Sequence, residues 1–511
     1  MSLNPLDIAV FLAFVAFVVG TSLYKSRKEE TSEDYFLAGR GLFWWLIGFS
    51  LIASNISTEQ FVGMNGQAAG NVGLAVASYD WIAAITLVFV AIFFLPKFLK
   101  SGIYTIPEYL EYRYCAAART IMAFYTMVIY VAVTIAAVVY SGALAIETIF
   151  GLNLTVSVWL VGIIAALYTT YGGLKAVVWT DLIQGAGLII GGAVITTIGF
   201  IKVGGVQSFF QANAHKLHMV LPADHPVLPW TALLIGLWIP NFYYWGLNQY
   251  IMQRTLAAKS LKHGQLGIIL AAGIQVILPL IIVIPGIMAL QLYSDEVTAK
   301  NDAAFPLLIK NLVPIGLKGF MFAALLGAIM SSLDSMLNSA STIFTMDLYK
   351  RHWRKNASPK SLIKIGRSAT VVFAVIGCLI APQLANPRFK GIFNYIQEFQ
   401  GFISPGILAA FVFGLIFKRA PASAAVTSLL LNVPIYGALL KFSQNLAFLN
   451  RMAITFGILI LTMAIITAVK PLPHPKVMPE KGGVDMKVAS SVVWLGAVVI
   501  AATITLYIIF W

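Results

Sequence analysis

The chain has 511 residues, of which 59% are hydrophobic and only 11% are charged, and its mean hydropathy is +0.86. This composition excludes a soluble globular protein, because apolar runs of about 18 to 25 residues recur along the whole length and predict membrane spans. The net charge of +14 indicates basic cytoplasmic loops rather than a nucleic-acid partner, and the two cysteines are too few for a disulfide framework or a metal site.

The apolar runs predict an all-α polytopic membrane protein with fourteen spans. The first run has no basic stretch before it and no small-residue cleavage site after it, so we expect a retained span rather than a signal peptide. The ninth run carries two prolines near its start, which predict a separate short helix there. The predicted spans are residues 5–24, 42–64, 73–96, 117–148, 155–172, 179–201, 229–253, 264–293, 305–345, 366–382, 391–416, 421–440, 446–469 and 488–510.

Basic residues predict the orientation of these spans. If the N-terminus is extracytoplasmic, most of the 34 basic residues fall in cytoplasmic loops, including the stretch KRHWRKNASPKSLIKIGR at residues 350–367. The positive-inside rule favours this orientation, and an even number of spans then places both termini outside. The short loops between spans are typical of a bacterial inner-membrane protein, which is the expected location.

Acidic side chains inside the predicted spans need a reason, because a charge in a bilayer is costly. No lysine or arginine is an obvious partner for them at the middle of a span. We therefore expect these acids to face a water-filled cavity that holds cations. They are Glu59, Asp80, Asp181, Asp334 and Glu398.

Two predicted spans have polar or proline-containing interruptions. The second contains SLIASNISTEQFVGMNG at residues 50–66, and the seventh contains LWIPNFYYWGLNQYIMQR, where Pro240 and Gly246 predict a break around Asn241. A helix that is broken within the membrane frees carbonyl groups, which can hold a cation if they line a cavity. The two breaks lie five spans apart, which predicts a transporter with an inverted repeat. For either break alone, an ordinary kink or a helix–helix hydrogen bond is the alternative.

The ninth span contains an unusual density of oxygen atoms. In GAIMSSLDSMLNSASTIF, residues 327–344, Ala328, Ser331, Ser332 and Ser335 follow helical spacing, and Asp334 with Asn338 extends that face. Hydroxyl and carbonyl oxygens are the ligands that hard cations such as sodium prefer. This face therefore predicts a sodium site that the break in the second span completes. The alternative is a serine-rich contact between packed helices.

Stretches across nearly the whole chain resemble the sodium/solute symporter family, and within it the sodium/galactose branch. They include SLIASNISTEQFVGMNG, GLAVASYDW, GIYTIPEYLEYRY, YTTYGGLKAVVWTDLIQ, NFYYWGLNQYIMQRTLAAKS, GFMFAALLGAIMSSLDSMLNSASTIFTMDLY and YIQEFQGFISPGILA. The resemblance implies a leucine-transporter-type core of two inverted five-span repeats. These correspond to residues 42–201 and 229–416, with the extra span 5–24 before them and three spans in 421–511 after them.

The resemblance also implies which residues bind sodium, sugar and a second cation. The implied sodium ligands are the carbonyls of Ala53, Ile56 and Ala328 and the hydroxyls of Ser331 and Ser332. The implied sugar ligands are Asn55, Gln60, Asp80, Asn241 and Gln397, with Tyr244 stacking under the ring as the inner gate and Met64, Tyr79 and Phe393 as the outer lid. A second cation site, similar to one in the sialic-acid branch, would comprise Asp181, Ser331, Asp334 and Ser335. The alternatives are that Asp334 takes a proton, or that it forms a salt bridge or hydrogen bond elsewhere.

Three departures from the galactose branch bear on the substrate. Asp80 stands where the branch has glutamate, Ala83 where it has serine, and Ala303 where it has lysine. No basic residue is evident for the substrate, so we expect it to be uncharged. Galactose itself is therefore left open in favour of another neutral hexose, a polyol such as inositol, or another sugar derivative.

The expected function is sodium-coupled import of a neutral sugar by alternating access, with sodium as the co-transported ion. A facilitator that ignores sodium is the alternative within transport. An enzyme is not expected, because the chain has no HExxH motif, Walker loop or dinucleotide fingerprint. A sensor would need an appended signalling domain, and none is evident. The expected partners are sodium, the sugar or polyol and the bilayer, with no nucleic acid and no obligate protein.

Overall fold

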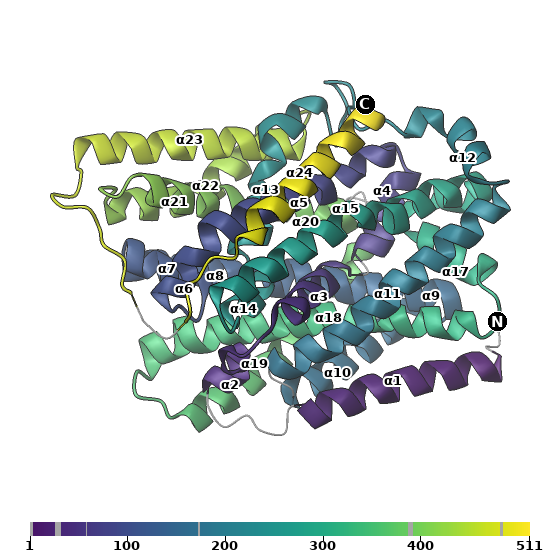
Figure 1. The fold of residues 1–511 in the computed structure, drawn as a ribbon, viewed down its shortest axis with the longest axis horizontal. Coiled ribbons are helices and arrows are strands. Elements are labelled where there is room, and N and C mark those ends of the chain that lie inside the picture. Colours follow the sequence, from purple (N-terminus) through teal and green to yellow (C-terminus); the bar gives the residue numbers. More distant parts are fainter. Residues whose placement is uncertain (1–3, 26–31, 58, 172–173, 387–391, 481–483) are drawn as a thin grey trace.

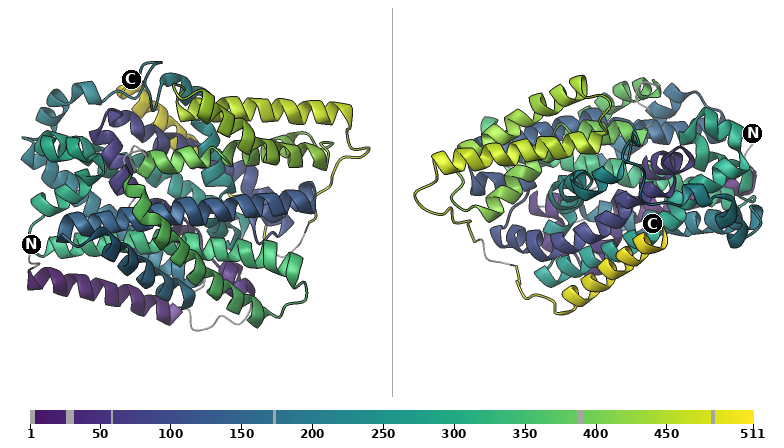
Figure 2. Two further views of the ribbon diagram at one scale, coloured as in Figure 1. Left: turned by 180° about the vertical axis from the view of Figure 1, so that it is seen from behind. Right: turned by 90° about the horizontal axis from the view of Figure 1, so that it is seen from above.

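The computed structural model of the protein describes residues 4–25, 32–57, 59–171, 174–386, 392–480 and 484–511. Every regular element in these residues is helical, apart from two isolated β-bridges. The helices lie side by side in one bundle (Figure 1), and α1, α23 and α24 lie on its outside (Figure 2). The prediction of an all-α protein is therefore confirmed.

The helices of the first half cover residues 5 to 212. They are α1 (Pro5–Lys25), α2 (Ser32–Leu37), α3 (Trp44–Asn55), α4 (Asn65–Ala69), α5 (Ser78–Phe89), α6 (Leu95–Ser101), α7 (Ile106–Arg113), α8 (Ala116–Ile129), α9 (Ala136–Phe150), α10 (Leu154–Tyr171), α11 (Leu174–Lys202) and α12 (Val206–Ala212). Wider π-helical turns join α5 to α6 and α8 to α9 without ending the helix.

The helices of the second half begin at residue 238. They are α13 (Trp238–Leu247), α14 (Gln249–Leu256), α15 (Leu261–Leu292), α16 (Ser294–Ala299), α17 (Ala304–Leu312), α18 (Leu317–Ile343), α19 (Pro359–Ile380), α20 (Ile392–Gln400), α21 (Ser404–Ile416), α22 (Ala422–Phe442), α23 (Phe448–Val469) and α24 (Ser491–Ile509). The separate short helix predicted before the ninth span is α17, and this prediction is confirmed.

In the described part of the chain, nine helical segments are long and apolar enough to cross a membrane. A tenth span is obtained if α20 and α21, which are bent by 45° at their junction, are counted together. A multi-pass membrane protein is therefore confirmed, whereas the number of fourteen spans stays a prediction. Helices α3, α11, α15 and α18 pack against one another at the centre.

The break predicted in the second span is present. Helix α3 ends at Asn55, and Ile56 has φ −71° and ψ 85°, which is not helical. The chain becomes helical again in a π-helical turn at Glu59–Met64 that leads into α4. Serine and asparagine side chains in this stretch compete with the backbone for hydrogen bonds, which favours an interruption here.

The break in the seventh span is also present, but its predicted position was wrong. Pro240 lies in the first turn of α13, directly after a π-helical turn at Ala232–Gly236, and it lacks the N–H that a continuous helix would bond to the carbonyl of Gly236. The helix runs on through Gly246 and is interrupted at Asn248, whose ψ of 124° is extended. The hydroxyl of Tyr130 donates a hydrogen bond to the Asn248 side chain and accepts one from the Tyr250 amide, which stabilises the interruption.

The start of α1 and the end of α24 lie in the same half of the bundle (Figure 1). Asp7 in α1 accepts hydrogen bonds of 2.8 Å from the amides of Gly316 and Gly319, at the start of α18. The carbonyl of Phe510 accepts a 2.8 Å hydrogen bond from the amide of Met219. Carboxylate oxygens are favourable at helix N-termini, so Asp7 anchors α1 to the central helix.

Candidate functional site

The predicted sodium residues meet where α3 breaks. The hydroxyl of Ser331 on α18 lies 3.2 Å from the carbonyl oxygen of Ala53, in the last turn of α3. The same hydroxyl lies 2.6 Å from a carboxylate oxygen of Asp181 on α11. Three central helices therefore come together at one serine, as the resemblance implied for this position.

The other predicted sodium ligands lie beside this contact and are fully buried. The hydroxyl of Ser332 has no hydrogen-bond partner among the described residues. Ala328 is one turn earlier on α18, and Ile56 is the first residue beyond α3. An unpartnered hydroxyl in a protein interior is costly, and a bound cation would remove the cost. Hydroxyls and freed carbonyls are a donor set that fits sodium.

Asp181 lies at the centre of a buried polar cluster. Besides Ser331, it accepts a 2.5 Å hydrogen bond from Ser50 and lies 3.3 Å from the guanidinium of Arg254. Arg254 is fully buried and also donates to Ser50 at 2.7 Å and to Ser335 at 2.8 Å. The expectation that Asp181 lacks a basic partner was wrong, because α14 continues into the core and places Arg254 there instead of in a cytoplasmic loop.

Asp334 has a different hydrogen-bond partner. One of its carboxylate oxygens accepts a hydrogen bond from the Thr169 hydroxyl of α10. The other is buried and has no partner in the part of the chain that the structure describes. Of the four residues implied for a second cation, Asp181, Ser331 and Ser335 therefore contact the cluster around Arg254, whereas Asp334 contacts α10.

Glu398 is the second acid for which the expectation of no basic partner was wrong. Its two carboxylate oxygens accept hydrogen bonds of 2.6 and 2.7 Å from the guanidinium of Arg451, and Tyr436 donates another of 2.9 Å. Arg451 is on α23 and Tyr436 is on α22. These contacts tie α20, which carries the predicted gate residue Phe393, to the C-terminal helices.

All the predicted sugar and gate residues line a single cavity next to the α3 break. Those are Asn55, Gln60, Asp80, Asn241, Tyr244 and Gln397 for the sugar, and Met64, Tyr79 and Phe393 for the lid. The cavity walls come from α3, the π-helical turn after its break, α5, α13, α15 and α20. Residues that are far apart in the sequence thus form one polar and aromatic cavity, which is a typical arrangement for a small-molecule site.

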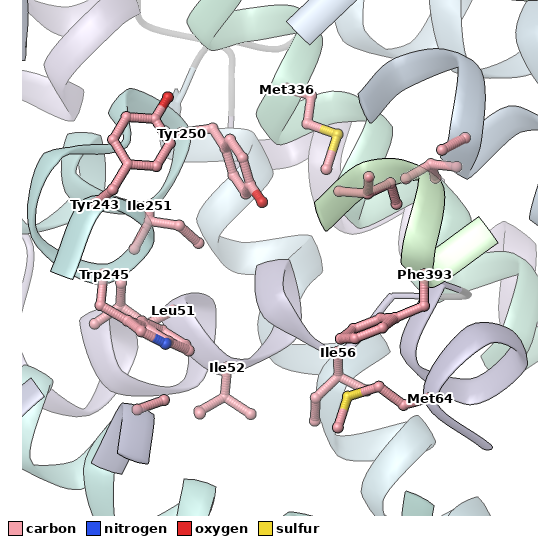
Figure 3. Close-up of a cluster of buried hydrophobic side chains, with 14 of the residues drawn as sticks. Leu51, Ile52, Ile56, Met64, Tyr243, Trp245, Tyr250, Ile251, Met336 and Phe393 are labelled. Atoms are coloured by element: carbon pink, nitrogen blue, oxygen red, sulfur yellow. The ribbon is translucent and has the colours of Figure 1, made fainter. Parts of the chain in front are cut away.

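The predicted lid residues contact one another. The rings of Tyr79 and Phe393 meet edge to face, with 4.8 Å between their centroids. Figure 3 shows Phe393 and Met64, and Phe393 also packs against Gly63, so the lid contacts the π-helical turn that follows the α3 break. On the other side of the cavity, the ring of Tyr244 lies 5.2 Å from Trp245 and 5.7 Å from Tyr250.

Gln275 is a cavity residue that the sequence analysis missed. Its side-chain amide donates a hydrogen bond to Asp80, and its oxygen lies 3.4 Å from the side-chain nitrogen of Asn55. It therefore orients two predicted sugar ligands. The signal was present, because Gln275 is an isolated amide in the middle of the long apolar helix α15. Glu59 also lines the cavity, although the sequence analysis gave it no role beyond that of a charge within a span.

The cavity is acidic rather than basic. Among the described residues that line it, two are carboxylates and none is lysine, arginine or histidine. Ala303, where the galactose branch has lysine, lies in a short turn and does not line the cavity. An anionic substrate would meet like charges here, so the cavity favours neutral or cationic ligands.

Comparisons with known proteins place this geometry in a family. The model of the sodium:solute symporter family matches residues 35–432. The sodium/glucose cotransporter of Vibrio parahaemolyticus is 43% identical over 495 residues, which cover 91% of this chain and 90% of the relative. The sodium/myo-inositol cotransporter 2 of Sus scrofa is 34% identical, over 84% of this chain and 69% of the relative.

A solved structure shows the same fold. The substrate-bound outward-open state of a Na⁺-coupled sialic acid symporter aligns with a TM-score of 0.83 at 24% identity, over 93% of this chain and 100% of the other.

An uncharacterized symporter of Escherichia coli K12 is 37% identical over 95% of this chain and 87% of the relative. The matches extend over the α3 break, the cavity and α18 alike, and the chain belongs to the sodium:solute symporter family.

Proposed function

We propose that the protein imports a neutral hexose together with sodium by alternating access. The observation that carries this proposal is that residues 53–60 serve two sites at once. The carbonyl of Ala53 faces Ser331, whereas Asn55 and Gln60 line the cavity a few residues further on. An ion that orders this short stretch therefore also arranges the sugar ligands.

The proposed sodium ligands are Ala53, Ile56, Ala328, Ser331 and Ser332. Bound sodium would hold the end of α3 against α18 and satisfy the Ser332 hydroxyl. Because sodium and sugar depend on the same break, each raises the affinity for the other by the same factor. A negative-inside potential adds about 2.3 kcal/mol of driving force per charge and 100 mV.

The sugar would be held by amides, one carboxylate and an aromatic face. Asn55, Gln60, Asp80, Asn241 and Gln397 offer donors and acceptors to hydroxyls, and Tyr244 covers the apolar side of the ring. Met64, Tyr79 and Phe393 close over the sugar from outside, and Tyr244 moves aside to release it inward. The alternation of access requires these two gates to open in turn.

The proposed membrane topology has both termini outside and the repeats at residues 42–201 and 229–416. Support comes from the start of α1 and the end of α24, which lie in the same half of the bundle (Figure 1), and from the basic loops that the sequence predicts on the cytoplasmic side. The inner membrane of a bacterium is the proposed location, and the bacterial relatives support it.

Sodium-coupled inositol transport is the second candidate function. It is favoured by the relatives named as myo-inositol cotransporters, which are 34% identical to this chain. Inositol and hexoses present similar rings of hydroxyls to amide and carboxylate groups, so the same cavity chemistry serves both. A sodium-independent facilitator would bind sugar in the same cavity. The contact between Ala53 and Ser331 would then have no part in transport.

Uptake by purified protein in proteoliposomes tests the proposal. We expect one neutral hexose or polyol from a labelled panel to accumulate with an inward sodium gradient and not when potassium replaces sodium, because sodium orders the α3 break. Equilibration at the same rate in both salts would show a facilitator instead. Accumulation of inositol but of no hexose would select the second candidate.

The serine ligands have a separate test in the sodium dependence of uptake. We expect Ser331→Ala and Ser332→Ala each to raise the sodium concentration for half-maximal uptake about tenfold or more, since each removes one oxygen ligand. Ser341→Ala is the matched control, because its buried hydroxyl bonds to the carbonyl of Asn338 within α18 at 2.9 Å. If all three variants kept the same sodium dependence, the proposed sodium site would be wrong.

A second sodium beside Asp334 is the further part of the proposal, with Asp181, Ser331 and Ser335 as its other implied ligands. The unpartnered carboxylate oxygen of Asp334 supports it. We expect Asp334→Ala to lower both the Hill coefficient for sodium and the charge moved per substrate. Thr169→Val removes the hydrogen bond but keeps the carboxylate, and serves as control. Unchanged values in Asp334→Ala would exclude Asp334 as a sodium ligand.

A further inference from the structure

Two carboxylates face the sugar cavity from different walls. Glu59 begins the π-helical turn that follows the α3 break, and Asp80 lies in the first turn of α5. Both line the same cavity as the phenol of Tyr244, which comes from α13. The proposed function uses only Asp80, as a ligand for sugar hydroxyls, and leaves Glu59 without a role.

Each carboxylate has an oxygen that is available to a ligand. One oxygen of Asp80 accepts from Gln275, and its other oxygen is buried without a partner among the described residues. One oxygen of Glu59 is likewise buried and has no partner in the described ranges. Asp80 is only 2% exposed, so solvent does not compensate for its missing partner.

The remaining walls provide no positive charge. The described residues that line the cavity offer amides, phenols and apolar side chains, and none of them is basic. Amides can donate to a carboxylate, but they do not neutralise it. Two negative charges close together in a membrane interior favour a cation between them. Because the described lining contains no basic side chain, the bound ligand would supply the positive charge.

We propose that the preferred substrate is an amino sugar whose protonated amino group is held by Glu59 and Asp80. This inference rests on the proposed sodium-coupled sugar transport, and it replaces the neutral hexose of that proposal with a sugar that carries a positive charge. An ammonium group offers three donors and a positive charge, and its hydrogen bonds to carboxylates are about twice as strong as neutral ones. The sugar hydroxyls still bond to Gln60, Asn241 and Gln397.

Competition for sodium-driven uptake tests this preference without any mutation. In proteoliposomes, labelled glucose or the labelled amino sugar itself is the reporter, and the competitors are 2-amino-, 3-amino- and 6-amino-deoxyglucose in buffer that keeps the amine protonated. Each amine is paired with its N-acetyl derivative, which keeps the nitrogen but removes the charge. We expect one amine to compete about ten- to hundredfold better than its N-acetyl partner and than glucose.

Charge measurement gives a second readout on the same wild-type protein. On a solid-supported membrane, the charge moved per molecule of the preferred amino sugar is expected to exceed that per molecule of glucose by one elementary charge.

Glu59→Gln and Asp80→Asn are expected to reduce the preference for the amine over its N-acetyl partner. Glu296→Gln, an exposed acid on α16, is the control and is expected to keep the preference.

The outcomes separate this inference from the function on which it rests. Sodium-driven uptake with no amine preferred over its N-acetyl derivative would overturn the amino-sugar inference and leave sodium–sugar symport intact. No sodium-driven uptake of any neutral or amino sugar would overturn both. A preference for the amine that persists in both Glu59→Gln and Asp80→Asn would show that these carboxylates do not recognise the amino group.

Discussion

The interruption of α3 between Asn55 and Glu59 is the feature on which the rest of the site depends. A continuous helix would use the carbonyl of Ala53 within its own backbone and would point Asn55 and Gln60 to different faces. The break instead turns a carbonyl toward Ser331 and the following side chains toward the cavity. Backbone that leaves the helix at membrane depth is tolerated only where protein or a cavity satisfies it, and here α18 and the cavity flank it.

The ion pair of Asp181 and Arg254 holds the surroundings of this break together. Its serine partners Ser50 and Ser54 are on α3, and Ser335 is on α18, while Arg254 itself is on the helix that follows the second break. A buried ion pair is stable only when its remaining donors and acceptors are satisfied, and these hydroxyls satisfy them. Both interrupted helices are thus connected through one buried cluster.

The sequence was sufficient for features that depend on local chemistry. The α3 break follows from adjacent serine, asparagine and glycine residues, and the oxygen-rich face of α18 follows from helical spacing. The extended residue of the seventh span was not predicted, because proline and glycine mark positions 240 and 246 and nothing local marks Asn248. The arginine partners of Asp181 and Glu398 could not be predicted, since each comes from a helix more than fifty residues away in the chain. Gln275 could have been found as an amide within an apolar helix, but its partners Asp80 and Asn55 lie on other helices and could not be predicted.

The central claim is that sodium and sugar bind through the same interrupted stretch of α3. Equilibrium binding of radioactive sodium to the purified wild-type protein, measured with and without a saturating transported sugar, tests it most directly. The account predicts that the sugar raises sodium affinity by the same factor by which sodium raises sugar affinity. A sodium affinity that is identical with and without the sugar would contradict the account, because the two sites would then not share the α3 break.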